Sequence, residues 1–337
     1  MSHNSPKRRD FLKYGAGAVT GLMSGSILRP QLIMAAKQEN GHPLAPKRAQ
    51  FKPRAQNLIV VNLSGGLSHI DSFDFKPKLQ ADHGKTIDWR GRPFFLNASP
   101  FSFSPRGESG IMVSDLFPHL GNLVDDMVVI RSMVNDHISH GQATLSMHCG
   151  LTTIPMPSLG SWISYGLGTE NPDLPSFIVL AAKSPYAGSQ VWDSSFLPRQ
   201  HAGTRIRPGA DPVPNLESPI ESLTLNELES KMLKRVNLKH MKSRALDAGL
   251  QARTATYDTA DGMMRIAPEL LDASTESEAT LESYGITSGD NISTAWQLLT
   301  ARRLVERGVR VVEVIHTGSG ANWDSHGNMG DHRVRAG

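Results

Sequence analysis

The stretch from Asn57 to Pro77 constrains the fold more than any other part of the chain. Residues 58–63 form a short apolar run rich in β-branched side chains, and Ser64-Gly65-Gly66 ends it. This pattern predicts a fully buried strand. Three side chains suited to metal binding or acid–base chemistry follow it, namely His69, Asp71 and Asp74. Open α/β sheets bind ligands at the carboxyl ends of such strands. A strand followed by an ordinary solvated turn is the alternative.

Further apolar runs predict strands at residues 127–132, 176–182 and 309–315. Helical patterns precede or follow them at residues 114–126, with Ser114 as N-cap, and at 158–168, 220–253 and 288–308. A further helix is predicted to begin near Ser139 and to end at Gly150. Residues 183–219 show no periodicity, and a connection of this length is usually functional or mobile. The alternation of helices and buried strands predicts an α/β fold with a mostly parallel sheet.

The distribution of charge argues against nucleic-acid binding. The chain has a formal net charge of +3 and a pI of about 9.0. The first 36 residues contain Lys7, Arg8, Arg9, Lys13 and Arg29 against Asp10 alone. The remainder is therefore near neutral, and no basic face for a phosphate backbone is predicted. Cys149 is the only cysteine, so the chain cannot form an internal disulfide.

The N-terminus resembles a twin-arginine export signal. Arg8-Arg9 are followed by Phe11-Leu12-Lys13 and by a weakly apolar stretch from Tyr14 to Leu28 that is too short for a stable membrane span. We therefore expect a signal at residues 1–36, a linker at 37–56 and an α/β domain at 57–337. The expected location is periplasmic or extracellular, with the twin-arginine machinery as a partner.

Three polar clusters follow three of the predicted strands. They are His69, Asp71 and Asp74; His137, Ser139 and His140; and Trp323, Asp324 and His326. Because parallel strands share a carboxyl edge, these clusters are expected to converge there. Asp and His without Cys suit zinc, calcium or manganese. Asp324 and His326 lie two apart, which lets an extended backbone direct both to one side.

The second cluster and the nearby Arg131 bear on whether the substrate is an anion. A helix that begins near Ser139 offers free N–H groups to an anion such as a phosphoryl group. Arg131 ends the predicted strand at residues 127–132 and is directed to the same edge, where it contacts either the substrate or an ordinary salt-bridge partner.

Several motifs together resemble the exported bacterial family called domain of unknown function 1501. They are the string Leu63 to Pro77, Ser114 to His119, Val129 to Met133 and Asn322 to Asn328, together with the segment from Phe196 to Pro219 and the leader. The resemblance implies membership of the alkaline phosphatase and sulfatase superfamily. It therefore implies a doubly wound sheet with helices on both faces and one or two divalent metals at its carboxyl edge.

The resemblance also implies roles for individual residues. Asp71 stands near the first metal position, Asp324 and His326 stand for the later ligand pair, and His140 lies close to the nucleophile position. Sulfatases have C-x-P-S-R or S-x-P-S-R there, whereas this chain has His140-Gly141-Gln142-Ala143-Thr144. This difference disfavours formylglycine chemistry. The family continues beyond the Asn322 to Asn328 motif, so the chain is expected to be the N-terminal part of a longer protein.

Three functions are compatible with these patterns. The first is an exported metal-dependent hydrolase of a phosphate or sulfate ester, with a small molecule or a polysaccharide as substrate. Its metal ligands would be Asp71, Asp324, His326 and His69, its catalytic groups His140 and Ser139, and its substrate contact Arg131. The second is a non-catalytic exported binding protein with the same fold. In the third, a structural protein, the Asp and His side chains are merely solvated.

Overall fold

The computed structural model describes residues 44–49, 51–216, 222–244, 247–316, 322–326 and 332, and the expected signal at 1–36 lies outside this part. Residues from Leu44 onward form one compact unit. The strands are β1 (Leu58–Leu63), β2 (Thr86–Trp89), β3 (Arg92–Phe95), β4 (Phe103–Arg106), β5 (Ile111–Ser114), β6 (Phe177–Ala181), β7 (Thr204–Ile206) and β8 (Val311–His316).

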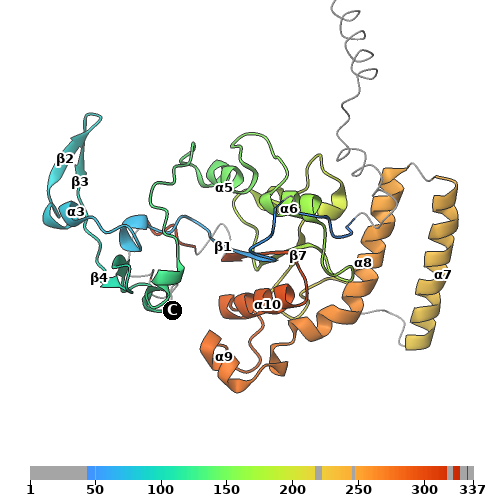
Figure 1. Cartoon of the computed structure of the whole chain (residues 1–337). Coiled ribbons are helices and arrows are strands. Elements are labelled where there is room, and N and C mark those ends of the chain that lie inside the picture. The colour runs from blue at the N-terminus through green and yellow to red at the C-terminus, as the bar shows by residue number, and fades with distance from the viewer. Residues whose placement is uncertain are drawn as a thin grey trace, which may run out of the picture. The chain divides into compact units, whose positions relative to one another are not determined.

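The helices lie between groups of these strands along the chain, and four of them separate β7 from β8 (Figure 1). They are α3 (Pro77–Ala81), α4 (Pro118–Gly121), α5 (His140–Cys149), α6 (Leu159–Leu167), α7 (Leu223–Lys242), α8 (Ala248–Leu271), α9 (Glu278–Tyr284) and α10 (Thr294–Glu306). Short 3₁₀ turns occupy His69–Asp71, Val124–Asp126, Gly188–Trp192, Arg199–His201 and Ala273–Thr275. Among the residues described, no helix has the length and apolarity that crossing a bilayer requires.

A four-stranded parallel sheet in the order β1-β8-β6-β7 forms the centre of the fold. Two antiparallel hairpins, β2-β3 and β4-β5, lie outside it. Val312 and Val314 of β8 pack in one apolar cluster with residues of α8 and α10. Val311 and Ile315 point to the other face, where Ile163 of α6 contributes. The predicted α/β class with a mostly parallel sheet is therefore confirmed, and helices cover both faces.

The prediction that β1 is fully buried is wrong, although its bounds are as predicted. Leu58, Ile59 and Val61 are exposed, because β1 is the edge strand and pairs only with β8 among the described strands. The strand predicted at residues 127–132 is also absent, since this segment has no strand partner, and Val128 is 87% exposed. An apolar run forms a strand only where a neighbour accepts its backbone hydrogen bonds.

Other helix boundaries differ from the prediction for local reasons. The helix predicted at 114–126 is replaced by β5, which ends at Ser114, and by a short α4 that begins at Pro118. Pro118 takes a first-turn position of α4, where its missing N–H has no helical acceptor to lose and its fixed φ suits the helix. The helix at 158–168 is confirmed as α6, with the Ser158 side chain as N-cap. The helical stretch at 220–253 divides into α7 and α8.

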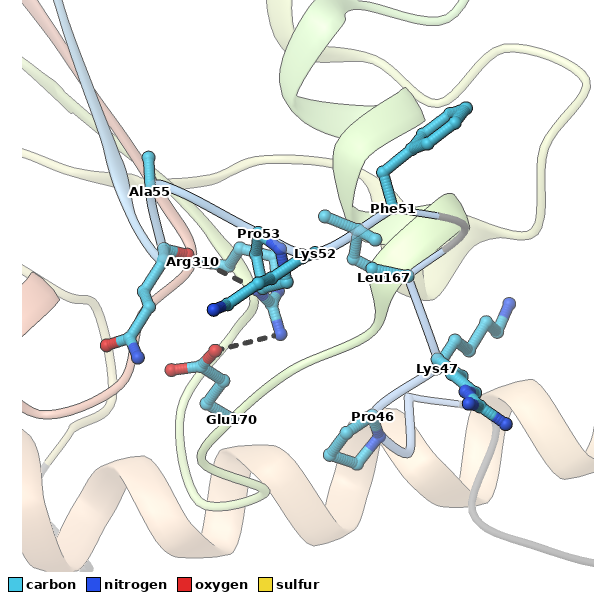
Figure 2. Close-up of a pocket in the computed structure, with 12 residues that line it drawn as sticks. Pro46, Lys47, Phe51, Lys52, Pro53, Ala55, Leu167, Glu170 and Arg310 are labelled. Atoms are coloured by element: carbon cyan, nitrogen blue, oxygen red, sulfur yellow. Dashed lines mark hydrogen bonds and ion pairs between the residues drawn. The ribbon is translucent and has the colours of Figure 1, made fainter.

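Residues 44–49 pack against the C-terminal end of α6. Leu44 is buried, and its carbonyl accepts a hydrogen bond from Thr169 N at 2.8 Å. Lys47 Nζ donates to the Tyr165 carbonyl at 2.6 Å and lies over the Tyr165 ring. Figure 2 shows this segment beside a pocket in which Arg310 forms an ion pair with Glu170 at 3.1 Å. This part of the predicted linker therefore belongs to the folded unit.

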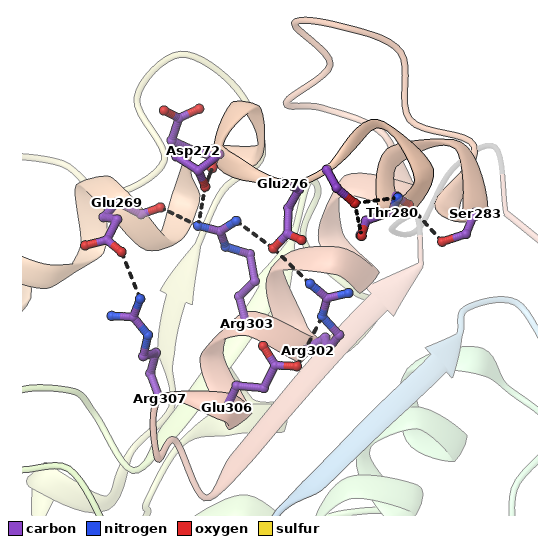
Figure 3. Close-up of polar contacts among 11 residues, drawn as sticks. Glu269, Asp272, Glu276, Thr280, Ser283, Arg302, Arg303, Glu306 and Arg307 are labelled. Atoms are coloured by element: carbon purple, nitrogen blue, oxygen red, sulfur yellow. Dashed lines mark hydrogen bonds and ion pairs between the residues drawn. The ribbon is translucent and has the colours of Figure 1, made fainter.

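An arginine network attaches α10 to the corner between α8 and α9 (Figure 3). Arg302 and Arg303 each contact Glu276 Oε1 at 2.8 Å, and Arg303 also donates to the Glu269 carbonyl at 2.7 Å. Burial alone would raise the pKa of Glu276, but the two guanidinium groups lower it overall. The network keeps α10, and with it the start of β8, in a fixed position.

His201 is buried beside α6 and is held in its neutral form. It is 2% exposed, and its Nδ1 lies 2.8 Å from Ser164 Oγ. The Tyr165 ring lies perpendicular to the imidazole, with centroids 5.3 Å apart. Desolvation, followed by the charge of Lys47, lowers the pKa of His201 to about 4.

We expect this group to make stability depend on pH. The unfolded chain takes up a proton on His201 at its ordinary pKa of 6.5, whereas the folded chain resists protonation until about pH 4. The contribution is complete above pH 6.5 and is lost as the pH falls to 4, by up to about 3 kcal/mol. Urea unfolding at about pH 7 and about pH 4.5 tests this. Wild type should lose more stability than His201→Gln, and equal losses would contradict the prediction.

Candidate functional site

The loops that follow β1 and β8 are bonded to each other at the carboxyl edge of the sheet. Trp323 N donates to the Ser64 carbonyl at 2.9 Å. Gly65 has a φ of +92°, and a Cβ atom there would lie 2.5 Å from Asp324 N. Only glycine permits both the backbone conformation and this close approach. The loops that follow β1 and β8 therefore meet at one edge of the sheet, as the topology rule predicts for parallel strands.

An aromatic stack supports the loop that carries Asp324. Trp323 is 2% exposed, and its Nε1 donates to His316 Nδ1 at 2.9 Å. Phe117 lies between Phe73 and Trp323, with ring centroids 5.6 and 6.0 Å away. His332 Nε2 lies 3.1 Å from the Trp323 carbonyl. The residue next to Asp324 is therefore packed on both sides and fixed in orientation.

Asp324 is the centre of the candidate site because its carboxylate contacts two imidazole rings. Its Oδ2 lies 2.9 Å from His140 Nε2, and its Oδ1 lies 2.8 Å from His326 Nε2. All three side chains are at least partly exposed to solvent. Burial alone would raise the pKa of Asp324, but the hydrogen bond from His326 and the charges of both rings lower it overall. A carboxylate that stays ionised can orient both rings.

Two further residues position this cluster. The ring of Tyr186 stacks on His140, with centroids 4.6 Å apart. The Tyr186 hydroxyl accepts a hydrogen bond from Asn322 Nδ2 at 2.7 Å, and Asn322 Oδ1 accepts one from Asp324 N at 3.0 Å. Sequence reasoning missed Tyr186, which lies in a segment without periodicity.

Ser139 lies at the open start of α5. The helix begins at His140 as predicted, and Ser139 occupies the N-cap position without a capping hydrogen bond from its side chain. The Ser139 backbone N–H donates to His137 Nδ1 at 3.0 Å. The Ser139 hydroxyl is exposed, so it remains available beside His140 and the free N–H groups of the first turn.

The other predicted site residues, Arg131 and the first cluster, have contacts of their own away from Asp324. Asp74 contacts Lys76 at 2.8 Å and Arg131 at 3.8 Å, and a pocket lies beside these three residues. The Lys76 hydrogen bond is the largest cause of a lowered pKa at Asp74, to which the charge of His69 also contributes. Asp71 is 3% exposed, and no residue that the structure describes donates a hydrogen bond to its carboxylate.

A buried ion pair beneath the candidate site was not predicted. His148 of α5 and Glu313 of β8 are 7% and 5% exposed, and His148 Nε2 lies 2.6 Å from Glu313 Oε1. His148 Nδ1 lies 2.7 Å from the Thr144 carbonyl, so both ring nitrogens face acceptors. Burial alone would lower the pKa of His148, but Glu313 and the Thr144 carbonyl raise it overall. The sequence does carry one sign of this pair, because Glu313 is an acidic residue within the otherwise apolar run of β8.

The carboxylate and the two imidazoles around Asp324 are side chains of the kinds that bind divalent cations such as zinc. Two ligands of a tetrahedral zinc ion lie about 3.3 Å apart, and His326 Nε2 and Asp324 Oδ1 are separated by 2.8 Å. Within the described ranges, however, no group of three or more His, Cys, Asp or Glu side chains has metal-binding geometry.

Comparison with known families identifies the class of this chain. The family described as "Protein of unknown function (DUF1501)" matches residues 55–336, which is most of the chain. The protein therefore belongs to the DUF1501 family, as its motifs indicated. No curated protein and no solved structure matches it.

Proposed function

We propose that this DUF1501 protein is an exported, metal-dependent hydrolase of a phosphate or sulfate ester. The observation that carries the proposal is the Asp324 carboxylate, which holds His140 and His326 beside the open N-terminus of α5. A carboxylate, two imidazoles and a free hydroxyl at the carboxyl edge of a parallel sheet supply what such a reaction requires. The likeness of the motifs to the alkaline phosphatase and sulfatase superfamily supports the same reaction class.

Asp324 and His326 would hold the cation, with Asp71 and His69 from the loop after β1 as the further ligands. Zinc, manganese and calcium each accept carboxylate oxygens, and zinc and manganese also accept imidazole. The bound cation would supply Lewis-acid stabilisation of charge on an ester oxygen.

His140 is the acid–base group in this proposal. Its Nε2 faces the carboxylate of Asp324, so that nitrogen carries a proton and Nδ1 is the basic atom. Nδ1 would accept the proton of Ser139 as the serine oxygen forms a bond to phosphorus or sulfur. The ester bond to the leaving oxygen breaks, and the same proton passes to that oxygen. Water then releases the acid from Ser139 with His140 as the base.

Helix α5 and Arg131 would bind the substrate's negative charge. The free N–H groups at the start of α5 face the transferred group beside Ser139. Arg131 lies 3.8 Å from Asp74 at the edge of a pocket, and we assign it to a remote anionic part of the substrate.

A non-catalytic binding protein with the same fold is the second candidate. It is favoured by the lack, within the described ranges, of a three-residue group in metal-binding geometry. The nucleophile position also lacks the sulfatase motif, because His140-Gly141-Gln142 stands there.

The proposal is tested on the full chain with nitrophenyl phosphate and nitrophenyl sulfate. Protein stripped with a chelator is reloaded with zinc, manganese or calcium, and both bound metal and turnover are measured. We expect turnover of one ester that disappears with the chelator and returns with the metal. Bound metal without turnover would support the binding protein, and neither metal nor turnover would contradict both candidates.

Export is tested by changing the paired arginines of the leader. We expect Arg8→Lys/Arg9→Lys to reduce the exported protein at least about tenfold, because the twin-arginine machinery reads this pair. The measurement is the amount of protein outside the cytoplasm after cell fractionation. Arg29→Lys, the same change elsewhere in the leader, should have no effect. Undiminished export of the double variant would contradict the prediction.

A further inference from the structure

Helix α6 turns its small residues toward the rest of the fold. Gly160, Ser161 and Ser164 are the buried residues of this helix. A Cβ atom on Gly160 would lie 2.5 Å from the ring of Phe177 in β6, and Ser164 Oγ lies 2.8 Å from His201 Nδ1. A helix that covers a core normally turns its large apolar side chains inward. Close packing on the inner side of α6 leaves its large side chains on the outer side.

The outer side of α6 is apolar and aromatic. Leu159, Trp162 and Tyr165 are exposed, and their spacing of three residues places them on one side of the helix. Phe196, from the loop after β6, is also exposed, and its ring centroid lies 5.8 Å from that of Trp162. These four residues form an aromatic surface. Exposed side chains gathered in this way mark an interaction site.

Basic side chains border the aromatic surface. Lys47 Nζ lies 4.7 Å from the centre of the Tyr165 ring. Lys47, Arg48 and Lys52 line one pocket beside the C-terminal end of α6 (Figure 2). All three are exposed, and Arg48 and Lys52 have no ion-pair partner among the residues that the structure describes. Phe51 lines the same pocket and is 82% exposed. This segment therefore extends the aromatic surface and adds positive charge to it.

Positive charge exceeds negative charge around the aromatic surface. Glu170 already forms an ion pair with Arg310 at 3.1 Å, so it does not offset the other cations. The neighbouring segments are residues 44–56, 158–170 and 193–199. Their basic residues are Lys47, Arg48, Lys52, Arg54 and Arg199, and their acidic residues are Glu170 and Asp193. The surface is therefore complementary to an anionic partner.

An anionic membrane surface fits this combination of side chains. Aromatic rings are favoured at the boundary of a bilayer, and clusters of Lys and Arg bind anionic headgroups. Phe51 and Phe196 offer no hydrogen-bonding group to the hydroxyls of a polysaccharide, whereas both rings can enter the apolar edge of a bilayer. We infer that the aromatic surface, together with Lys47, Arg48 and Lys52, docks the protein peripherally on a bilayer that contains anionic lipids.

The test is co-sedimentation of the full chain with lipid vesicles. Wild type is expected to bind vesicles of phosphatidylcholine mixed with phosphatidylglycerol at least about tenfold more tightly than phosphatidylcholine alone, and salt should weaken the binding. Arg48→Gln/Lys52→Gln should weaken binding to the mixed vesicles about tenfold. Lys78→Gln/Lys183→Gln removes two exposed lysines outside the surface and should leave binding unchanged. Every variant keeps residues 1–36, so any binding by that stretch cancels in the comparison.

The aromatic contribution is tested with a matched pair of variants. Phe51→Ser should weaken binding to the mixed vesicles about tenfold, because its ring no longer enters the bilayer. Phe95→Ser makes the same change at an exposed residue of β3 and should have no effect. Both should unfold in urea as wild type does, since both rings are exposed.

Three results would overturn the inference. The first is equal binding of wild type to vesicles with and without phosphatidylglycerol. The second is an equal loss of binding in a test variant and its control. The third is tighter binding to dextran sulfate than to the mixed vesicles, which would make an anionic polysaccharide the partner of this surface.

Discussion

Replacing Asp324 with asparagine is expected to reduce kcat/KM for ester turnover at least about a hundredfold. Asparagine keeps the size of the side chain but removes the charge that both His140 and His326 contact at 2.9 and 2.8 Å. The orientation of the acid–base ring and one proposed metal ligand are lost together. Steady-state turnover of the metal-loaded full chain measures the effect, and metal content is determined in the same samples.

Asp211→Asn is the matched control for this change. Asp211 is exposed, and no residue that the structure describes forms an ion pair with it. Its replacement should leave turnover, metal content and unfolding unchanged. Unchanged turnover in Asp324→Asn would remove the site from the proposed reaction.

Breaking the buried pair of His148 and Glu313 is expected to cause the largest loss of stability. Either Glu313→Leu or His148→Leu leaves one polar partner buried without the other, at a cost of about 3–5 kcal/mol. The double variant His148→Leu/Glu313→Leu removes both and should recover most of that loss. Urea unfolding near neutral pH gives the four free energies of this double-mutant cycle.

The pH dependence of the same pair has a defined sign. Because the folded pKa of His148 is raised above 6.5, its stabilisation is complete below pH 6.5 and is lost as the pH rises through the folded pKa. As the pH becomes alkaline, the free energy of unfolding of wild type should therefore fall relative to that of the double variant. Single variants that cost less than about 1 kcal/mol would show that the pair does not hold α5 on β8.

Local signals predicted the elements that hold the site. The apolar runs of β1, β6 and β8 and the Ser158 cap of α6 are visible in the local sequence, and the predicted elements lie where these signals stand. The segment at 127–132 carries the same kind of run but lacks a partner strand, which no local pattern reveals. The prediction that β1 is buried was wrong for a related reason. The order of the strands puts β1 at the edge of the sheet, and the local sequence does not reveal that order.

The candidate site was predicted in part. The topology rule brought the loops of β1 and β8 together, and the helix start placed His140 at the same edge. Tyr186 could not be found, because its contact with His140 depends on the path of an aperiodic loop. Arg131 lies beside Asp74. This contact depends on the path of the turn after β1, which the strand-order rule does not predict.

The edge position of β1 also affects how the protein behaves at high concentration. Alternate backbone N–H and C=O groups of this strand point away from β8, and Ile59 and Val61 are exposed beside them. Such an edge is a template to which an extended segment of another molecule adds, and aggregation begins in this way. A lysine in place of Val61 would act as a gatekeeper against it and would leave the carboxyl end of the strand untouched.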